Sequence, residues 1–193
     1  MNKIALYGDS LMTGLMNGEP SDILNNYVID ELTGMGFPGY EILKFGRRGE
    51  GSAEGLERLD EVVAANPDFV VICFGTNDSI KHKDPVETYG DNLRKLVEAF
   101  PAEKVIVLTP GYVNVAIRTE ADNDRQQAYA EMAKEVAAEK GVNVIDLYHH
   151  MTIYPEPNEF LQDDGLHPSN EGYHFLGALI ARDIKNKLLE VQN

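Results

Sequence analysis

Five short apolar runs alternate along the chain with five longer segments of helical periodicity, and this alternation constrains the fold more than any other feature. The run at 69–74, Phe-Val-Val-Ile-Cys-Phe, is apolar without alternation, which is typical of a strand covered on both faces in a parallel sheet. We therefore expect this run to lie centrally. The runs occupy residues 3–7, 40–45, 69–74, 104–109 and 142–147.

The segments between the runs carry signals for the ends of helices. Asp84, Pro85 and Glu87 combine a candidate N-cap, a proline at the first helical position and a carboxylate three residues after the cap. Glycines at 36 and 141 are stop signals for two other helices. The expected helices cover residues 21–35, a segment around 56–63 that ends before Asn66 and Pro67, 85–100, 120–140 and 169–189.

Five strand–helix units predict an α/β fold, in which right-handed crossovers place helices on both faces of a five-stranded parallel sheet. The length of 193 residues suits one domain spanning 1–193. In doubly wound sheets, ligands bind outside the carboxyl ends of the strands. The segments that directly follow the apolar runs are therefore the places to look for a functional site.

The charge balance and the cysteine content exclude several classes of function. The chain has 32 Asp plus Glu against 17 Lys plus Arg and a net charge of -15, so it lacks the clustered cations of a general nucleic-acid binder. Cys73 is the single cysteine, which excludes an intramolecular disulfide and cysteine-based metal frameworks. The first apolar run is broken at once by Gly8-Asp9-Ser10, unlike a signal peptide, and no run approaches the ~18–20 residues of a membrane span. We expect a cytoplasmic protein without a stable membrane anchor, and no pattern indicates its oligomeric state.

The segments after the runs contain the groups that acyl transfer needs. A serine hydroxyl becomes a good nucleophile when an imidazole takes its proton and an acceptor fixes the tautomer of that imidazole. Ser10 follows the first run, and His167 lies in the last loop, three residues after Asp164. At this spacing the carboxylate of Asp164 folds back to accept Nδ1–H of His167, which directs Nε2 toward Ser10. Pro168 disfavours a helical conformation at His167, and Ser169 is a candidate N-cap for the last helix.

Three of these loops also offer donors for an oxyanion, whose stabilisation is commonly the largest catalytic effect. Ser10 offers its backbone N–H, Gly49 offers another after the second run, and Asn77 offers a side-chain amide after the third. Taken singly, Gly49 is more often a turn glycine and Asn77 an Asx-turn former. Their joint position after neighbouring strands favours an oxyanion hole.

At this point the chain resembles the SGNH hydrolases, also called GDSL esterases and lipases, whose name lists Ser, Gly, Asn and His in four sequence blocks. The resemblance implies Ser10 as nucleophile, His167 as general base and acid, and Asp164 as the orienting carboxylate. It further implies an oxyanion hole of Ser10, Gly49 and Asn77, a flavodoxin-like three-layer α/β/α sandwich, and no cofactor or metal. The matching blocks are Gly8-Asp9-Ser10-Leu11, residues 46–52 with 55–59, Gly75-Thr76-Asn77-Asp78, and residues 164–168.

The sequence departs from the family pattern at one place, and two aspartates that match the pattern have no role in the predicted chemistry. The second block usually carries Asn two residues before its first glycine, and Lys44 occupies that place here. Asp9 and Asp78 match the pattern, and we interpret them as residues that organise the loops.

Other classes of protein fit the sequence less well. The glycines of residues 49–55 are a near miss for a dinucleotide fingerprint, since the third is one residue late and the motif follows the second strand. Met12 stands where the nucleophile elbow of α/β-hydrolases has glycine. A metal hydrolase and a non-catalytic flavodoxin-like module that binds a sugar or nucleotide remain as alternatives. The metal alternative would use ligands from Asp163, Asp164, His167, His149 and His150.

The substrate is expected to be a small carboxylic ester, either a short-chain acyl ester or a lysophospholipid, with sugar O-acetates and acyl-CoA thioesters as alternatives of the same family. Arg47 and Arg48 beside Gly49 either engage an anionic group or pair with neighbouring acids, and the excess of carboxylates favours pairing. Apolar residues after the first and fourth runs either line an acyl channel or pack within helices and loops: Leu11, Met12, Leu15, Met16, Tyr112, Val113, Val115 and Ile117.

Overall fold

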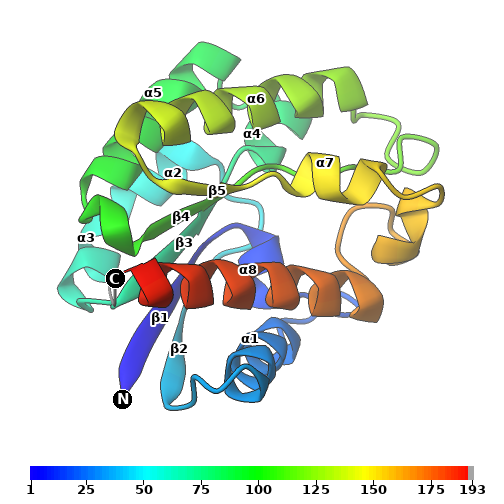
Figure 1. Cartoon of the computed structure of the whole chain (residues 1–193). Coiled ribbons are helices and arrows are strands. Elements are labelled where there is room, and N and C mark those ends of the chain that lie inside the picture. The colour runs from blue at the N-terminus through cyan, green and yellow to red at the C-terminus, as the bar shows by residue number, and fades with distance from the viewer. Residues whose placement is uncertain (191–193) are drawn as a thin grey trace.

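The sheet is parallel, has five strands in the order β2-β1-β3-β4-β5, and lies in the middle of the molecule (Figure 1). This order is the one of flavodoxin-like sheets, so the predicted fold class is confirmed. The computed structural model describes residues 1–190. β3 pairs with both β1 and β4, and every residue of it is buried, as expected for a central strand. The strands are β1 (Asn2–Gly8), β2 (Tyr40–Gly46), β3 (Phe69–Cys73), β4 (Val105–Leu108) and β5 (Asn143–Ile145).

Helices cover both faces of the sheet because alternate side chains of the buried strands are apolar on each side (Figure 1). In β1, Ile4 and Leu6 belong to the core under α1 (Ile23–Gly34) and α8 (Asn170–Glu190), which pack against each other. Ala5 and Tyr7 belong to the second core, on the opposite face. The helices of that face are α2 (Ser52–Glu57), α3 (Leu59–Ala64), α5 (Val86–Glu98) and α6 (Asn123–Lys140).

The prediction of a single helix around 56–63 is wrong in one respect. This segment forms two helices, α2 and α3, which are separated at Arg58. The guanidinium of Arg58 is buried and donates to the carbonyls of Phe45 at 2.8 Å and Gly8 at 3.1 Å, and its Nε bonds Glu50 at 2.7 Å. These bonds join the ends of β1 and β2 to the helical layer. A periodicity of apolar residues does not reveal such a buried cation.

The predicted start of α5 is also shifted, because Pro85 and not Asp84 is the N-cap, and the helix begins at Val86. The carboxylate of Asp84 accepts from the side-chain amide of Asn92 at 3.4 Å, and its carbonyl accepts the Tyr129 hydroxyl at 2.5 Å. Asp84 is therefore held by tertiary partners rather than by the helix end.

Several short helical turns have no counterpart in the sequence prediction, and some of them lie at the carboxyl ends of strands. The predicted strand at 142–147 ends at Ile145, because Asp146 accepts the His149 N–H at 3.0 Å and begins a helix. These turns are too short for a recognisable apolar stripe. They are η1 (Ser10–Thr13), α4 (Thr76–Ile80), η2 (Ala102–Lys104), α7 (Leu147–Thr152) and η3 (Pro157–Phe160).

Among residues 1–190, each helix is too short or too polar to cross a membrane.

Candidate active site

Ser10 lies at the carboxyl end of β1, as the first residue of the turn η1. Gly8 permits this position: a Cβ there would lie 2.2 Å from the Cys73 carbonyl oxygen, so a larger residue would separate β1 from β3. Asp9 caps the turn, since its carboxylate accepts the Leu11 N–H at 3.0 Å. The serine hydroxyl is thus presented from a rigid strand end rather than from a flexible loop.

His167 and Asp164 lie in the loop before α8 and are brought to Ser10 by that loop. Oδ1 of Asp164 accepts the backbone N–H groups of Leu166 and His167, each at 3.0 Å, and Oδ2 lies 2.5 Å from His167 Nδ1. Nε2 of His167 lies 2.9 Å from Oγ of Ser10. The local spacing therefore produces the geometry that was predicted for this loop.

The carboxylate of Asp164 is kept ionised by its hydrogen bonds. Partial burial acts to raise its pKa, but the hydrogen bonds from His167 and Leu166 outweigh burial and hold the pKa below its usual value. Arg118 adds a cation to the same loop: its Nε donates to the Asp164 carbonyl at 2.8 Å, and Nη2 lies 3.5 Å from Oδ2. Ser169 caps α8 as predicted, accepting the Gly172 N–H at 3.1 Å.

The three predicted oxyanion donors line one hollow of about 250 Å³ together with His167. Gly49 has a φ of 76°, a conformation that side chains disfavour. Among the described residues, the N–H groups of Ser10 and Gly49 have no hydrogen-bond acceptor. The Asn77 amide donates to the Glu50 carbonyl at 2.9 Å and makes only a long 3.5 Å contact with Asp9. The contact with Asp9 is the weaker of the two, so it is the one that a ligand oxygen in the hollow would replace.

Asp78 ties the loop after β3 to the start of α2. Its carboxylate accepts the N–H of Ser52 at 2.9 Å, the hydroxyl of Ser52 at 2.6 Å and the N–H of Gly75 at 3.1 Å. These contacts agree with the interpretation of Asp78 as a residue that organises the loops around Asn77.

Asp9 is buried beside Asn77, and burial raises its pKa to about 7, with the nearby Asp78 charge adding to the effect and the Leu11 N–H opposing it. In the unfolded chain this carboxyl titrates near 3.8. Between these values the folded state binds the extra proton, so the contribution of Asp9 to stability is greatest below about pH 4 and is lost as the pH rises to about 7.

Replacing Asp9 by Asn removes this titration. When the pH rises from about 5 to about 8, the free energy of unfolding of the wild type is expected to fall relative to that of Asp9→Asn by about 2–3 kcal/mol. Urea unfolding of both proteins at the two pH values measures the difference. An equal free-energy difference between the two proteins at both pH values would show that Asp9 does not titrate in this range.

The structure divides the predicted apolar lining into two groups. Leu11, Tyr112 and Val113 line an apolar pocket next to the site. The other five predicted residues lie elsewhere: Met12 and Leu15 are buried in the core, Met16 packs against it, and Val115 and Ile117 are exposed.

The two arginines beside Gly49 also behave differently. Arg47 pairs with Glu61 at 3.1 Å, whereas Arg48 lines the hollow that contains Ser10 and bonds the Gly18 carbonyl at 2.8 Å. Lys44, which departs from the family pattern, forms an ion pair with Asp22 next to α1.

Sequence reasoning missed two cations of the site, Arg118 and Lys81. Lys81 stands four residues after Asn77 and caps the short helix α4. Recognising that helix would have placed both side chains on one face, because residues four apart are neighbours on a helix. Arg118 gave no such signal, since it reaches Asp164 across 46 residues of sequence.

The metal alternative has no support in the described part of the chain, where no three His, Cys, Asp or Glu side chains are grouped to hold an ion. The rings of His149 and His150 lie 6.0 Å apart and tilted by 60°. Asp164 is engaged by Leu166, His167 and Arg118.

A flavodoxin-like sheet with a hydrogen-bonded serine, histidine and aspartate at the carboxyl ends of its strands is the arrangement of SGNH hydrolases, a class of ester hydrolases. Within that class, the chain belongs to the GDSL-like lipase/acylhydrolase family, which it matches over residues 6–175.

Two solved structures are similar over nearly the whole chain. The crystal structure of a lipase/acylhydrolase from Enterococcus faecalis is 40% identical, with a TM-score of 0.92, and the alignment covers 97% of each chain. A mutant of an acetyl-xylooligosaccharide esterase from Geobacillus stearothermophilus is 26% identical, with a TM-score of 0.76, covering 95% of this chain and 94% of the other.

Curated relatives match over a smaller part of their own length. An isoamyl acetate-hydrolyzing esterase from Schizosaccharomyces pombe is 31% identical over 117 residues, which are 55% of this chain and 46% of the yeast protein. A GDSL esterase/lipase from Arabidopsis thaliana is 26% identical over 173 residues, 75% of this chain and 66% of the plant protein. The chain thus spans less than two thirds of these curated relatives.

Proposed function

We propose that the protein is a serine carboxylic ester hydrolase that removes small acyl groups, with acetyl as the preferred group. The observation that carries the proposal is the hydrogen-bonded chain from Asp164 through His167 to Ser10, with distances of 2.5 Å and 2.9 Å. Both distances are within the reach that proton transfer requires. Membership of an acylhydrolase family supports the same activity.

The mechanism follows from these positions. His167 Nε2 takes the proton of Ser10 as Oγ attacks the ester carbonyl, and Asp164 stabilises the imidazolium that forms. The oxyanion is bound by the N–H groups of Ser10 and Gly49 and by the side-chain amide of Asn77. His167 then protonates the leaving alcohol, and the acyl-enzyme is hydrolysed when His167 activates a water molecule.

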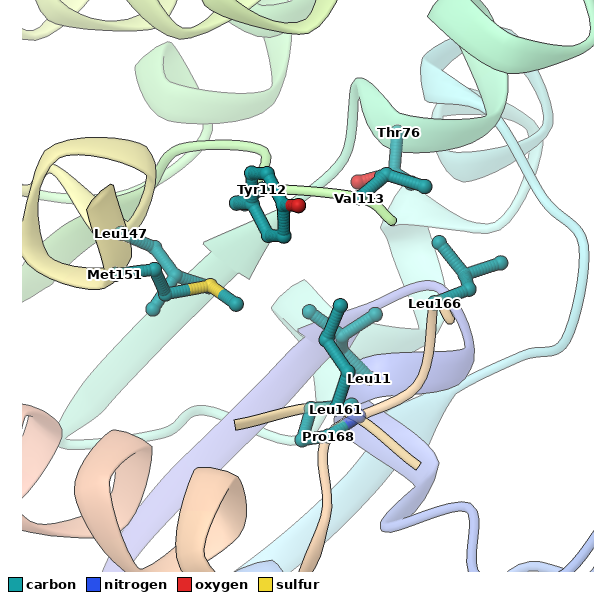
Figure 2. Close-up of a pocket in the computed structure, with 10 residues that line it drawn as sticks. Leu11, Thr76, Tyr112, Val113, Leu147, Met151, Leu161, Leu166 and Pro168 are labelled. Atoms are coloured by element: carbon teal, nitrogen blue, oxygen red, sulfur yellow. The ribbon is translucent and has the colours of Figure 1, made fainter. Parts of the chain in front are cut away.

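An apolar pocket that is lined by Leu11, the residue after Ser10, limits the size of the acyl group in this proposal (Figure 2). The side chains of Leu11, Tyr112, Met151 and Leu166 surround it, drawn from the loop after β1, the loop after β4, α7 and the loop before α8 (Figure 2). Its cavity volume is about 20 Å³, and on this measure one water molecule needs about 10–15 Å³. The pocket therefore suits a methyl-sized group and disfavours the long chains of lysophospholipids and fatty acyl thioesters.

The names of two relatives support the same acyl group. The yeast relative is described as hydrolysing isoamyl acetate, and the bacterial structure is an acetyl-xylooligosaccharide esterase. The second of these favours a sugar O-acetate as a second candidate substrate, because it shares the fold and 26% of the sequence.

The test is a series of p-nitrophenyl esters, acetate, butyrate and octanoate, with an acetylated xylose and a lysophospholipid alongside. We expect kcat/KM for acetate to exceed that for octanoate by about tenfold or more, because a chain longer than the pocket leaves apolar carbons in water. A preference for octanoate or the lysophospholipid would overturn the proposed acyl group. Faster turnover of the acetylated sugar than of the aryl acetate would favour the carbohydrate esterase.

A matched pair of variants sharpens this test. Met151→Ala enlarges the pocket and is expected to raise the octanoate-to-acetate ratio of kcat/KM by about five- to tenfold. Met132→Ala makes the same substitution in the core on the opposite face of the sheet and is expected to leave the ratio unchanged. Equal ratios in the two variants would show that Met151 does not limit the acyl group.

A further inference from the structure

The catalytic hollow has a charge opposite to that of the whole chain. Three cations, Arg48, Lys81 and Arg118, line it together with Ser10 and His167, and no carboxylate is among its lining residues. The chain as a whole has a net charge of -15. A long-range field of that sign repels anionic ligands, so any preference for an anion has to come from these local cations.

Two of the three cations have no carboxylate partner in the described part of the chain. Arg118 is neutralised by Asp164 at 3.5 Å and Glu120 at 3.7 Å. Arg48 and Lys81 instead bond neutral backbone carbonyls, of Gly18 at 2.8 Å and of Gly49 at 3.3 Å. These carbonyls hold the two cations in place beside the oxyanion donors, and the charge of Lys81 acts only at longer range on the buried Asp9.

Three acids of the surrounding loops are engaged elsewhere. Glu50 forms an ion pair with the buried Arg58 at 2.7 Å. Asp78 is held by Ser52 and Gly75, and Asp9 is buried beneath Asn77. A ligand anion placed between Arg48 and Lys81 therefore meets no carboxylate that competes for them within the hollow.

In the proposed binding mode, the two cations lie on the side of Ser10 that the alcohol portion of the ester occupies. Ser10 follows β1, which stands between β2 and β3 in the sheet. Arg48 follows β2, and Lys81 reaches from α4 to the Gly49 carbonyl on the same side. Half of the residues that line the apolar pocket assigned to the acyl group come instead from segments that follow β4 and β5, and the others are Leu11 after β1, Thr76 after β3 and three residues of the loop before α8. An ester with its acyl group in that pocket directs its alcohol toward the cations.

We propose that Arg48 and Lys81 form a subsite for an anionic group, a carboxylate or a phosphate, on the alcohol portion of the substrate. This inference rests on the proposed function and narrows it from small acyl esters to small acyl esters of anionic alcohols. Arg48 offers a planar donor pair suited to either anion, and Lys81 offers a point charge next to the Gly49 loop.

The test compares four acetate esters of one shape that differ in charge. These are 3-acetoxybenzoate, 3-acetoxyphenyl phosphate, the neutral 3-acetoxybenzamide and the cationic 3-acetoxyphenyltrimethylammonium. Each kcat/KM is divided by the rate of hydroxide-catalysed hydrolysis of the same ester, which removes differences between leaving groups. At about 10 mM salt we expect an anionic ester to exceed the neutral one by about tenfold and the cationic one by more. At about 0.5 M salt the advantage is expected to shrink, because screening shortens the reach of exposed charges.

Three variants assign the preference to residues. Arg48→Glu and Lys81→Met are each expected to lower the anionic-to-neutral ratio by about fivefold or more, with a ratio below one for the charge reversal. Arg47→Met is the matched control, because it removes a neighbouring cation that is paired with Glu61 outside the hollow. Its ratio is expected to stay within about twofold of the wild type. Because ratios are compared, a general loss of activity does not affect the result.

The outcomes separate the two proposals. Preference for the carboxylate or for the phosphate ester identifies which anion the subsite takes, and dependence on Arg48 or Lys81 supports the inference. Hydrolysis of all four esters at equal normalised rates, or an equal change of ratio in Arg47→Met, would overturn the subsite and leave the esterase intact. Hydrolysis of none of the four would overturn the esterase, and the subsite with it.

Discussion

Ser10→Ala is expected to lower kcat/KM for p-nitrophenyl acetate by about 10⁴- to 10⁶-fold, because no other group stands where its Oγ can attack the carbonyl. The hydroxyl bonds only His167 among the described residues, at 2.9 Å. Ser10→Ala therefore removes a single hydrogen bond, the one to His167. We expect the variant to fold like the wild type. Steady-state kinetics with the aryl acetate, and thermal unfolding of the same preparations, provide the two measurements.

A second serine provides the control for this experiment. Ser79 is buried in α4, two residues from Asn77, and its hydroxyl has no hydrogen-bond partner in residues 1–190. Ser79→Ala is expected to retain activity within about twofold. A loss of less than about tenfold in Ser10→Ala would contradict a nucleophilic role for Ser10.

His167→Ala is expected to lose nearly as much activity as Ser10→Ala, because an unactivated hydroxyl is a weak nucleophile. The two residues act as one unit, so the double variant is expected to be no slower than either single variant. The measurement is a double-mutant comparison of kcat/KM for p-nitrophenyl acetate. Additive losses in the double variant would show that Ser10 and His167 act in separate steps.

His149→Ala is the matched control for His167 and also tests the metal alternative. His149 is an exposed residue on α7, and a metal centre that used it would lose activity together with His167. A serine hydrolase predicts unchanged kcat/KM in His149→Ala and in the presence of a chelator.

The main features of the fold and of the site were predictable because they depend on local sequence. The uninterrupted apolar run at 69–74 indicated a central parallel strand, and the alternation of strands and helices indicated a doubly wound sheet, while the flavodoxin-like arrangement came from the resemblance to the family. The geometry of His167 depends on Asp164 three residues earlier and on Pro168 immediately after it, so short-range spacing was enough to predict it.

Features set by contacts distant in sequence were not predictable. Arg58 splits a helix because its guanidinium bonds carbonyls of two different strands, at Phe45 and Gly8. Arg118 reaches Asp164, and Lys81 reaches Gly49, across loops whose conformation the sequence pattern does not encode. Arg47 forms an ion pair and Arg48 does not, and this difference likewise depends on where Glu61 lies in the folded chain.

We propose that the apolar pocket and the neighbouring hollow recognise the substrate by different kinds of interaction. In the proposed function, the apolar pocket at Leu11 and Met151 limits the acyl group by its volume. The cations at Arg48 and Lys81 select the alcohol by charge, which makes that selection sensitive to salt. The acyl preference is expected to stay constant as salt rises, because burial of apolar surface does not depend on screening at these concentrations.

The most direct test of a serine nucleophile activated by His167 is covalent labelling by a fluorophosphonate, followed by mass spectrometry of the peptide that contains Ser10. The folded wild-type protein is expected to form one adduct at Ser10, with no labelling of Ser10→Ala and at least about 10²-fold slower labelling of His167→Ala. An unlabelled Ser10 in folded wild-type protein, or equal labelling rates with and without His167, would contradict the assignment of the active site.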